Sequence, residues 1–190
     1  MTDYNASFLS SEEARGMPFK ALGSGVLIDR TVSLVNIENI SIGGNTRIDA
    51  YSTLIATGEI SIGSNVHISA HAYFAGRAGI ELRDFSNISS GVRLYSVSDD
   101  FSGRTMTNPM IPERFKDLRF GRVTIGRHAI VGTGTVVLPG VEIGEGCAVG
   151  SLSLVKQSTE PWGIYAGIPA RRIGERSREL LALETEFLKK

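Results

Sequence analysis

Aliphatic and aromatic residues recur at every sixth position over most of this chain of 190 residues. The first four sets begin at Leu22, Ile42, Ile62 and Leu82, and after an interruption the period resumes at Ile125 without slippage. A period of six fits neither an amphipathic helix, with its period of about 3.6, nor the simple alternation of a strand. It fits a coil of three short strands that each point one apolar side chain inward, with Gly, Asn and Asp at the corners. The sequence therefore predicts a parallel β-helix of about six stacked coils.

Three segments lie outside this period. Residues 95–122 form an insertion with two prolines, and a long loop in a compact domain is usually functional or disordered. Ser10 followed by Glu13 predicts a short capped helix near the N-terminus. The apolar pattern at the other end predicts a second helix, and both helices are interpreted as caps on the open coil ends. The expected organisation is an N-terminal cap over 1–21, the coil over 22–173 with 95–122 inserted, and a C-terminal helix over 174–190.

Charge and cysteine content narrow the range of partners. The 20 Lys and Arg balance the 20 Asp and Glu, so no broad attraction to nucleic acid or to an anionic membrane is expected. A single cysteine, Cys147, excludes an internal disulfide and fits a reducing compartment; its tight glycine-rich turn indicates core packing. No apolar run approaches a membrane span, and the first residues lack the apolar core of a signal peptide. We therefore expect a cytoplasmic protein.

Two motifs near the end of the coil carry a resemblance to a known family. They are VTIGRHAIVGTGTVVLPGVEIGEGCAVGSLSLVKQ and, after it, YAGIPARRI. Together with the period of six, they resemble the hexapeptide-repeat acyltransferases, especially sugar O-acetyltransferases and N-acyltransferases for nucleotide-linked amino sugars. The resemblance implies an all-β, left-handed parallel β-helix; periodicity alone does not give the hand, since parallel crossovers are otherwise nearly always right-handed. It also implies a homotrimer that binds acetyl-CoA as co-substrate between its subunits.

The resemblance places the contacts with acetyl-CoA on the last coils. Carried over position by position, the pantetheine contacts fall at Thr133 and Ser151. A guanidinium suits the phosphates because its planar fork donates two parallel hydrogen bonds. The polar and basic positions that match the family's phosphate-binding end are Lys156, Gln157, Arg171 and Arg172, with Arg176 beside them.

The sequence departs from the O-acetyltransferases at the expected active site. Where those enzymes place a catalytic histidine after a strand, this chain has Asp99, and the 95–122 insertion contains no histidine. A sugar hydroxyl needs a base near neutrality, whereas a neutral amine is already nucleophilic and needs orientation. Asp99 therefore favours N-acylation. Arg77 takes the place of an acceptor-binding aspartate of the family, and this reversal of charge fits a negatively charged acceptor such as a nucleotide diphosphate.

Two of the three histidines flank Ile68 and Ala70, one coil below Asp99. Strand alternation would put His67, Ser69 and His71 on the face opposite the inward Ile68. We therefore expect Asp99 to orient the amine and His67 or His71 to receive or relay its proton, while His128 follows a glycine turn and caps a corner. The predicted acceptor contacts are Ser69, Arg77, Tyr95, Ser98, Asp100 and, more weakly, Asn108, Arg104 and Glu113.

These features predict an acetyl-CoA-dependent acyltransferase for the amino group of a nucleotide-linked deoxyamino sugar, and the resemblance implies a role in bacterial surface polysaccharide (O-antigen or capsule). Two alternatives remain: O-acetylation of a sugar, with His67 or His71 as the base, and a trimeric scaffold without catalysis. Carbonic anhydrases of the gamma type share this kind of scaffold and need three converging histidines. The three histidines here, His67, His71 and His128, do not match that family's spacing, so no metal is predicted.

Overall fold

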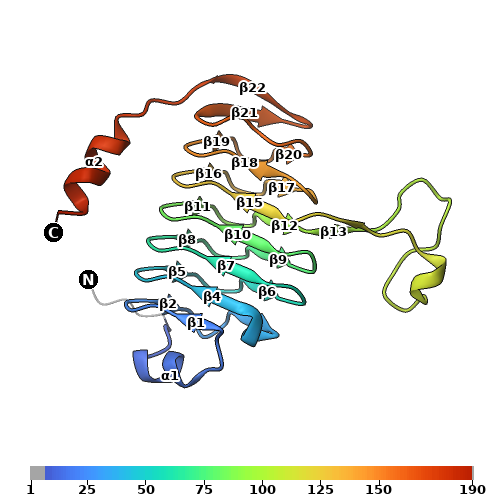
Figure 1. Cartoon of the computed structure of the whole chain (residues 1–190), viewed down its shortest axis with the longest axis horizontal. Helices are drawn as coiled ribbons and strands as arrows, with labels where there is room; N and C mark the ends of the chain where they lie inside the picture. The colour runs from blue at the N-terminus through green and yellow to red at the C-terminus, as the bar shows by residue number, and fades with distance from the viewer. Residues whose placement is uncertain (1–6, 190) are drawn as a thin grey trace.

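The computed structural model describes residues 7–189 and shows a three-sided prism of parallel strands, with the coils stacked from the N-terminal to the C-terminal end (Figure 1). The first six residues of the expected N-terminal cap, and Lys190 of the expected helix, lie outside this range. The first face contains β1 (Ala21–Leu22), β4 (Ile40–Ile42), β7 (Ile60–Ile62), β10 (Ile80–Leu82), β15 (Val123–Ile125) and β18 (Glu142–Ile143). The second contains β2 (Leu27–Ile28), β5 (Arg47–Ile48), β8 (His67–Ile68), β11 (Asn87–Ile88), β16 (Ile130–Val131) and β19 (Ala148–Val149). The third contains β3 (Ser33–Val35), β6 (Thr53–Ile55), β9 (Tyr73–Ala75), β12 (Arg93–Tyr95), β17 (Val136–Val137) and β20 (Leu154–Val155).

The core of the prism is the set of residues that recur at every sixth position, as predicted. Equivalent residues of successive coils pair in parallel register, for example Ile48 with Ile68 and Ile68 with Ile88. These side chains are fully buried, whereas Leu22 and Leu34 in the first coil are only partly covered. The parallel β-helix of six complete coils is therefore confirmed.

The N-terminal end of the coil carries the expected helical cap, whereas the C-terminal helix packs against Phe85 and His128 on the side of the prism and does not cap the coil end (Figure 1). The helix α1 (Ser11–Gly16) begins with the predicted capping box between Ser10 and Glu13. At the other end, β21 (Gly163–Gly167) and β22 (Ala170–Glu175) form an antiparallel hairpin on the second face. The expected helix over 174–190 therefore begins later, as α2 (Leu180–Phe187). No helix within residues 7–189 combines the length and apolarity needed to cross a membrane.

The insertion is an arm that projects away from the prism between β12 and β15 (Figure 1). Its base is a short antiparallel ladder of β13 (Val97–Ser98) and β14 (Arg119–Phe120), and a 3₁₀ turn, η2 (Glu113–Phe115), lies further out. A second such turn, η1 (Ile37–Asn39), lies at a corner of the coil. Tyr95, expected at the start of the insertion, is the last residue of a coil strand.

Replacing Phe74 by alanine should test how strongly the inward stack stabilises the prism. Phe74 is among the largest fully buried side chains, and removing it leaves a cavity that the rigid coils above and below cannot fill. We expect a loss of about 3–5 kcal/mol in the free energy of unfolding, measured by denaturant titration. Val35→Ala, on the same face but 40% exposed, serves as the control. A loss at Phe74 no larger than at Val35 would contradict the inward packing.

Candidate active site

A groove of about 1040 Å³ lies between the arm and the third face of the prism. Five of the predicted site residues line it. They are Tyr95, Ser98, Asp99, Asp100 and Lys156. The structure thus brings three of the expected acceptor contacts, Tyr95, Ser98 and Asp100, together with Lys156, an expected acetyl-CoA contact that is far from them in sequence.

The base of the arm builds one wall of this groove. The antiparallel ladder pairs Ser98 with Arg119 and Val97 with Phe120. All four residues line the groove, and Asp99 follows directly after the ladder. The coils above supply the opposite wall, where Leu138, Pro139 and Leu154 add an apolar surface. The groove therefore combines a polar wall on the arm with an apolar wall on the coil.

The two adjacent aspartates have different environments. Asp100 is buried and accepts hydrogen bonds from the backbone N–H of Ser102 at 2.9 Å and from the hydroxyls of Ser102 and Thr105 at 2.7 and 3.2 Å. These bonds, led by those from Ser102, lower the pKa of Asp100 to about 2. Asp99 is only partly buried, and its Oδ1 accepts one long bond, from the N–H of Asn108 at 3.4 Å. Asp100 is therefore fixed as part of a turn, and Asp99 is the carboxylate available to a ligand.

Removing the Ser102 hydroxyl by Ser102→Ala should raise the pKa of Asp100 towards its ordinary value of 3.8. A carboxylate with a lowered folded-state pKa stabilises the folded state above its unfolded pKa, and this contribution is lost as pH falls through the folded pKa. The turn should thus be fully stabilised above a pH of about 4 and weaken towards about 2. An NMR titration of the Asp100 carboxyl carbon measures the shift, with Ser98→Ala as the control. An unchanged titration in Ser102→Ala would contradict this account of the turn.

His67 lies on the second face and is held by a carboxylate from the coil below. Its Nε2 is 2.8 Å from Oδ2 of Asp49, and Nε of Arg47 donates to Oδ1 of the same side chain at 2.6 Å. Burial raises the pKa of Asp49, but the hydrogen bonds from Arg47 and His67 outweigh burial and leave that pKa below its ordinary value. In the neutral imidazole, donation of Nε2–H to this carboxylate leaves Nδ1 of His67 as the acceptor. Ser69 follows β8 on this face.

His71 is not part of the same strand, which corrects the expected alternation. The strand β8 ends at Ile68, and His71 turns the corner to the third face with a left-handed φ of 62°. Its ring stacks on Tyr51 at 5.3 Å between centroids. It lines a shallow depression of about 390 Å³ that shares Tyr95 with the groove. His71 therefore lines a depression that adjoins the groove within one chain.

The predicted acetyl-CoA contacts form two groups. Thr133 and Ser151 are exposed on successive coils at the corner between the second and third faces, where the N–H of Leu152 donates to the carbonyl of Thr133. The coils approach so closely here that a Cβ at Gly132 would lie 2.5 Å from the backbone nitrogen of Ser151. Exposed backbone and small side chains suit a thin pantetheine arm. Of the remaining positions, Lys156 lines the groove, and Gln157, Arg171 and Arg172 are exposed at this end of the prism.

The predicted acceptor contacts outside the groove lining include Asn108 and Arg77. Asn108 is in the arm, where its backbone N–H reaches Asp99 and its side chain accepts from the N–H of Met110 at 2.9 Å. Arg77 is at the corner below the arm and pairs with Glu113 at 2.5 Å. The groove thus gathers some of the predicted acceptor contacts but not these two side chains.

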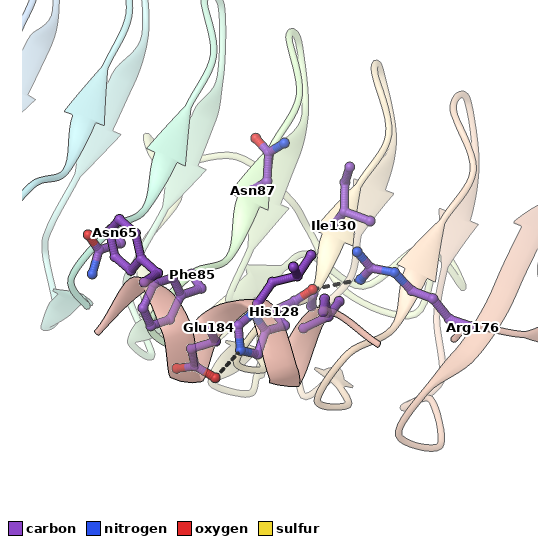
Figure 2. Close-up of a pocket in the computed structure, with 11 residues that line it drawn as sticks. Asn65, Phe85, Asn87, His128, Ile130, Arg176 and Glu184 are labelled. Carbon is purple, nitrogen blue, oxygen red and sulfur yellow. Dashed lines mark hydrogen bonds and ion pairs between the residues drawn. The ribbon is translucent and has the colours of Figure 1, made fainter. Parts of the chain in front are cut away.

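His128 caps a corner, as predicted, and anchors the C-terminal helix (Figure 2). Its Nε2 is 2.8 Å from Oε2 of Glu184 on α2, and its ring stacks on Phe85 at 5.1 Å. Arg176, considered for phosphate binding, donates to the carbonyl oxygens of His128 and Gly146 at 2.7 and 3.1 Å. Both residues therefore attach the C-terminal segment to the coil. The three histidines lie at separate places and do not converge on one point.

The sequence reasoning missed several residues at these sites. Arg119 and Phe120 line the groove because they belong to the ladder at the base of the arm. The sequence of the insertion has no periodic pattern that predicts this ladder. Asp49 was also missed, yet the coil length of twenty residues places Arg47 directly below His67 and Asp49 below Ser69. That offset is visible in the sequence and would have found Asp49.

Comparison with known proteins agrees with this geometry. Residues 122–157 match the family model described as bacterial transferase hexapeptide (six repeats). The chain is 40% identical over 182 residues, 95% of both chains, to the dTDP-4-amino-4,6-dideoxy-D-glucose acyltransferase of Escherichia coli. The chain belongs to the hexapeptide-repeat acyltransferases.

Solved structures of hexapeptide-repeat acyltransferases extend this result. AntD, an N-acyltransferase from Bacillus cereus, is 43% identical in a variant bound to dTDP-4-amino-4,6-dideoxyglucose and coenzyme A, with a TM-score of 0.95 over 98% of this chain and 99% of that chain. AntD bound to dTDP and 3-hydroxybutyryl-CoA is 44% identical, with a TM-score of 0.93 over 96% and 97%. The fold is thus the left-handed parallel β-helix of these acyltransferases, and the expected enzyme class is confirmed.

Proposed function

We propose that this acyltransferase transfers an acyl group from acyl-CoA to the 4-amino group of dTDP-4-amino-4,6-dideoxyglucose or a close analogue. The observation that carries the proposal is full-length similarity to two proteins whose names or complexes contain this same sugar nucleotide. Acetyl is the acyl group expected from the sequence, and the bound 3-hydroxybutyryl-CoA of AntD makes a longer hydroxyacyl group the main alternative.

The groove supports an amine as the nucleophile. Asp99 offers its carboxylate there with only one weak protein contact, so it is free to accept hydrogen bonds from the amino group. The side chains of Lys156 and Arg119 line the same groove and bring positive charge to it, which suits an acceptor and a donor that both carry phosphates. Within one chain the groove lining contains no histidine, so a base for a hydroxyl acceptor would have to be supplied by His67 or His71 from outside this wall.

The proposed reaction is an attack of the neutral amine on the thioester carbon. A C–N bond forms, the tetrahedral intermediate collapses with loss of the C–S bond, and the coenzyme leaves as a thiolate. The nitrogen sheds one proton, which ends on that thiolate. Asp99 orients the amine for attack, and His67 or His71 relays the proton. His67 is the better oriented of the two because Asp49 holds its ring.

We further propose a homotrimer with the active sites between subunits. His67 lies on the second face and Asp99 beside the third, so one chain does not present them to a single ligand. Two neighbouring prisms that align these faces bring them together. In this arrangement Thr133 and Ser151 line the path of the pantetheine, and Arg171, Arg172 and Gln157 lie near its phosphates.

O-acetylation of a sugar is the second candidate. The chain is 36% identical over 74 residues to a putative lipopolysaccharide biosynthesis O-acetyl transferase of Escherichia coli, but this match covers only 39% of the chain. The same relative supports a role in surface polysaccharide synthesis. We place that role in the cytoplasm, where sugar nucleotides and acyl-CoA are both available.

The deciding experiment measures CoA release by thiol titration with acetyl-CoA and 3-hydroxybutyryl-CoA as donors. The acceptors are dTDP-4-amino-4,6-dideoxyglucose, its 3-amino counterpart, its 4-hydroxy counterpart and a free neutral sugar. We expect turnover with the 4-amino sugar nucleotide and almost none with the hydroxyl acceptors. Turnover confined to the hydroxyl acceptors would replace N-acylation by O-acetylation.

A further inference from the structure

We infer that Arg77 is a positioning residue that fastens the base of the arm and so fixes the arm wall of the groove. It acts on the acceptor indirectly, through Glu113 and Phe120, in place of the direct contact expected from the sequence. This structural role of Arg77 is separate from the proposed function. Only its expected effect on the acceptor KM rests on the proposed function.

The position of Arg77 in the coil suits this role. Arg77 follows β9 at the corner between the third and first faces, and one coil higher the arm leaves the prism at that same corner. The Ser96 hydroxyl bridges the two coils, because it accepts from the N–H of Ala78 at 2.9 Å and donates to the carbonyl of Ala75 at 2.8 Å. Arg77 thus projects from the coil directly beneath the ladder at the base of the arm.

Two contacts join Arg77 to the arm. Its Nη2 is 2.5 Å from Oε1 of Glu113, the first residue of η2. Its guanidinium carbon also lies 5.1 Å from the ring centroid of Phe120 in β14, within the range of a cation–π interaction. The guanidinium lowers the pKa of Glu113, so this carboxylate is ionised at neutral pH. One side chain therefore holds both the base of the arm and a turn further out.

The arm needs such support because its own ladder is short. β13 and β14 pair through two residues each, and an isolated two-stranded ladder of any length is only marginally stable. Phe120 lines the groove as well as contacting Arg77, whereas Arg77 itself is absent from the groove lining. Arg77 therefore supports from behind the wall that carries Ser98 and Asp99.

Limited proteolysis with chymotrypsin tests this role without requiring turnover. Phe115 lies in η2 with Glu113 and is partly covered, so the rate of cleavage after Phe115 reports how often this part of the arm detaches. We expect Arg77→Gln and Glu113→Gln each to accelerate cleavage about three- to tenfold, as the loss of an exposed ion pair and a cation–π contact predicts. The double variant should be cleaved no faster than Arg77→Gln, and Arg77→Lys should retain part of the protection.

The matched control is Glu59→Gln, which breaks an exposed ion pair with Lys20 at the same corner of the prism but away from the arm. It should leave the cleavage rate within about twofold of the unmodified chain. In kinetic assays, Arg77→Gln and Glu113→Gln should both raise KM for the acceptor with a smaller change in kcat. Unchanged cleavage in both variants, with a raised acceptor KM in Arg77→Gln alone, would overturn the inference and restore a direct acceptor contact.

Discussion

Replacing Asp99 by asparagine should lower kcat for the amino-sugar acceptor about a hundredfold, while KM for acyl-CoA changes little. The asparagine keeps the size of the side chain but removes the negative charge that orients the amine and favours its loss of a proton. Because the Asp99 carboxylate accepts just one long hydrogen bond, from the N–H of Asn108, among residues 7–189, the substitution should not disturb the arm. The loss should therefore appear in catalysis and not in stability.

Steady-state kinetics with CoA release as the signal measures this loss, and thermal unfolding checks that the variant is folded. Asp117→Asn is the matched control, since Asp117 is an exposed aspartate of the same arm that does not line the groove. It should retain nearly full turnover. Near-normal kcat in Asp99→Asn would remove Asp99 from the mechanism and would leave the histidines as the groups to test.

The repetitive part of the chain is predictable because a single physical rule sets it. Every sixth residue points inward, and every coil is about twenty residues long, so residues such as Ile48, Ile68 and Ile88 must stack. The same offset places His67 above Arg47. A side-chain contact between neighbouring coils, such as that of His67 with Asp49, can therefore be predicted from the sequence once the period is known.

The structures of the arm and of the C-terminal hairpin cannot be predicted from this period. Within the described part of the chain, the arm strands pair only with each other, and in the hairpin β21 still pairs with β19 of the coil while β22 pairs with β21. The ladder of Val97 with Phe120 joins residues on either side of a long irregular stretch, and no local pattern marks it. Arg77 is an example. Its match to an acceptor-binding position of the family predicted a contact with the acceptor, whereas in the structure it contacts Glu113 and Phe120 of the arm.

Mixing two inactive variants should restore activity if the active site lies between subunits. Asp99→Asn removes the carboxylate beside the third face, and His67→Ala removes the imidazole from the second face. Each variant alone should fall to a few per cent of normal turnover or less. In trimers assembled from equal amounts, each site takes Asp99 from one subunit and His67 from its neighbour. Both residues are then intact in about one quarter of all sites, so about 25% of normal activity should return in the unfractionated mixture, and about one third in mixed trimers isolated from it.

The control for this experiment mixes Asp99→Asn with the double variant Asp99→Asn/His67→Ala, which gives no site an intact pair. The two chains carry different affinity tags, so that mixed trimers can be isolated by sequential purification after co-expression. Recovery well above both parents and above this control requires that the two residues act on one substrate from different chains. If isolated mixed trimers show no recovery although each parent is impaired, the two residues do not form an intersubunit site. In that case His71, which lines the same depression as Tyr95, becomes the histidine to test within a single subunit.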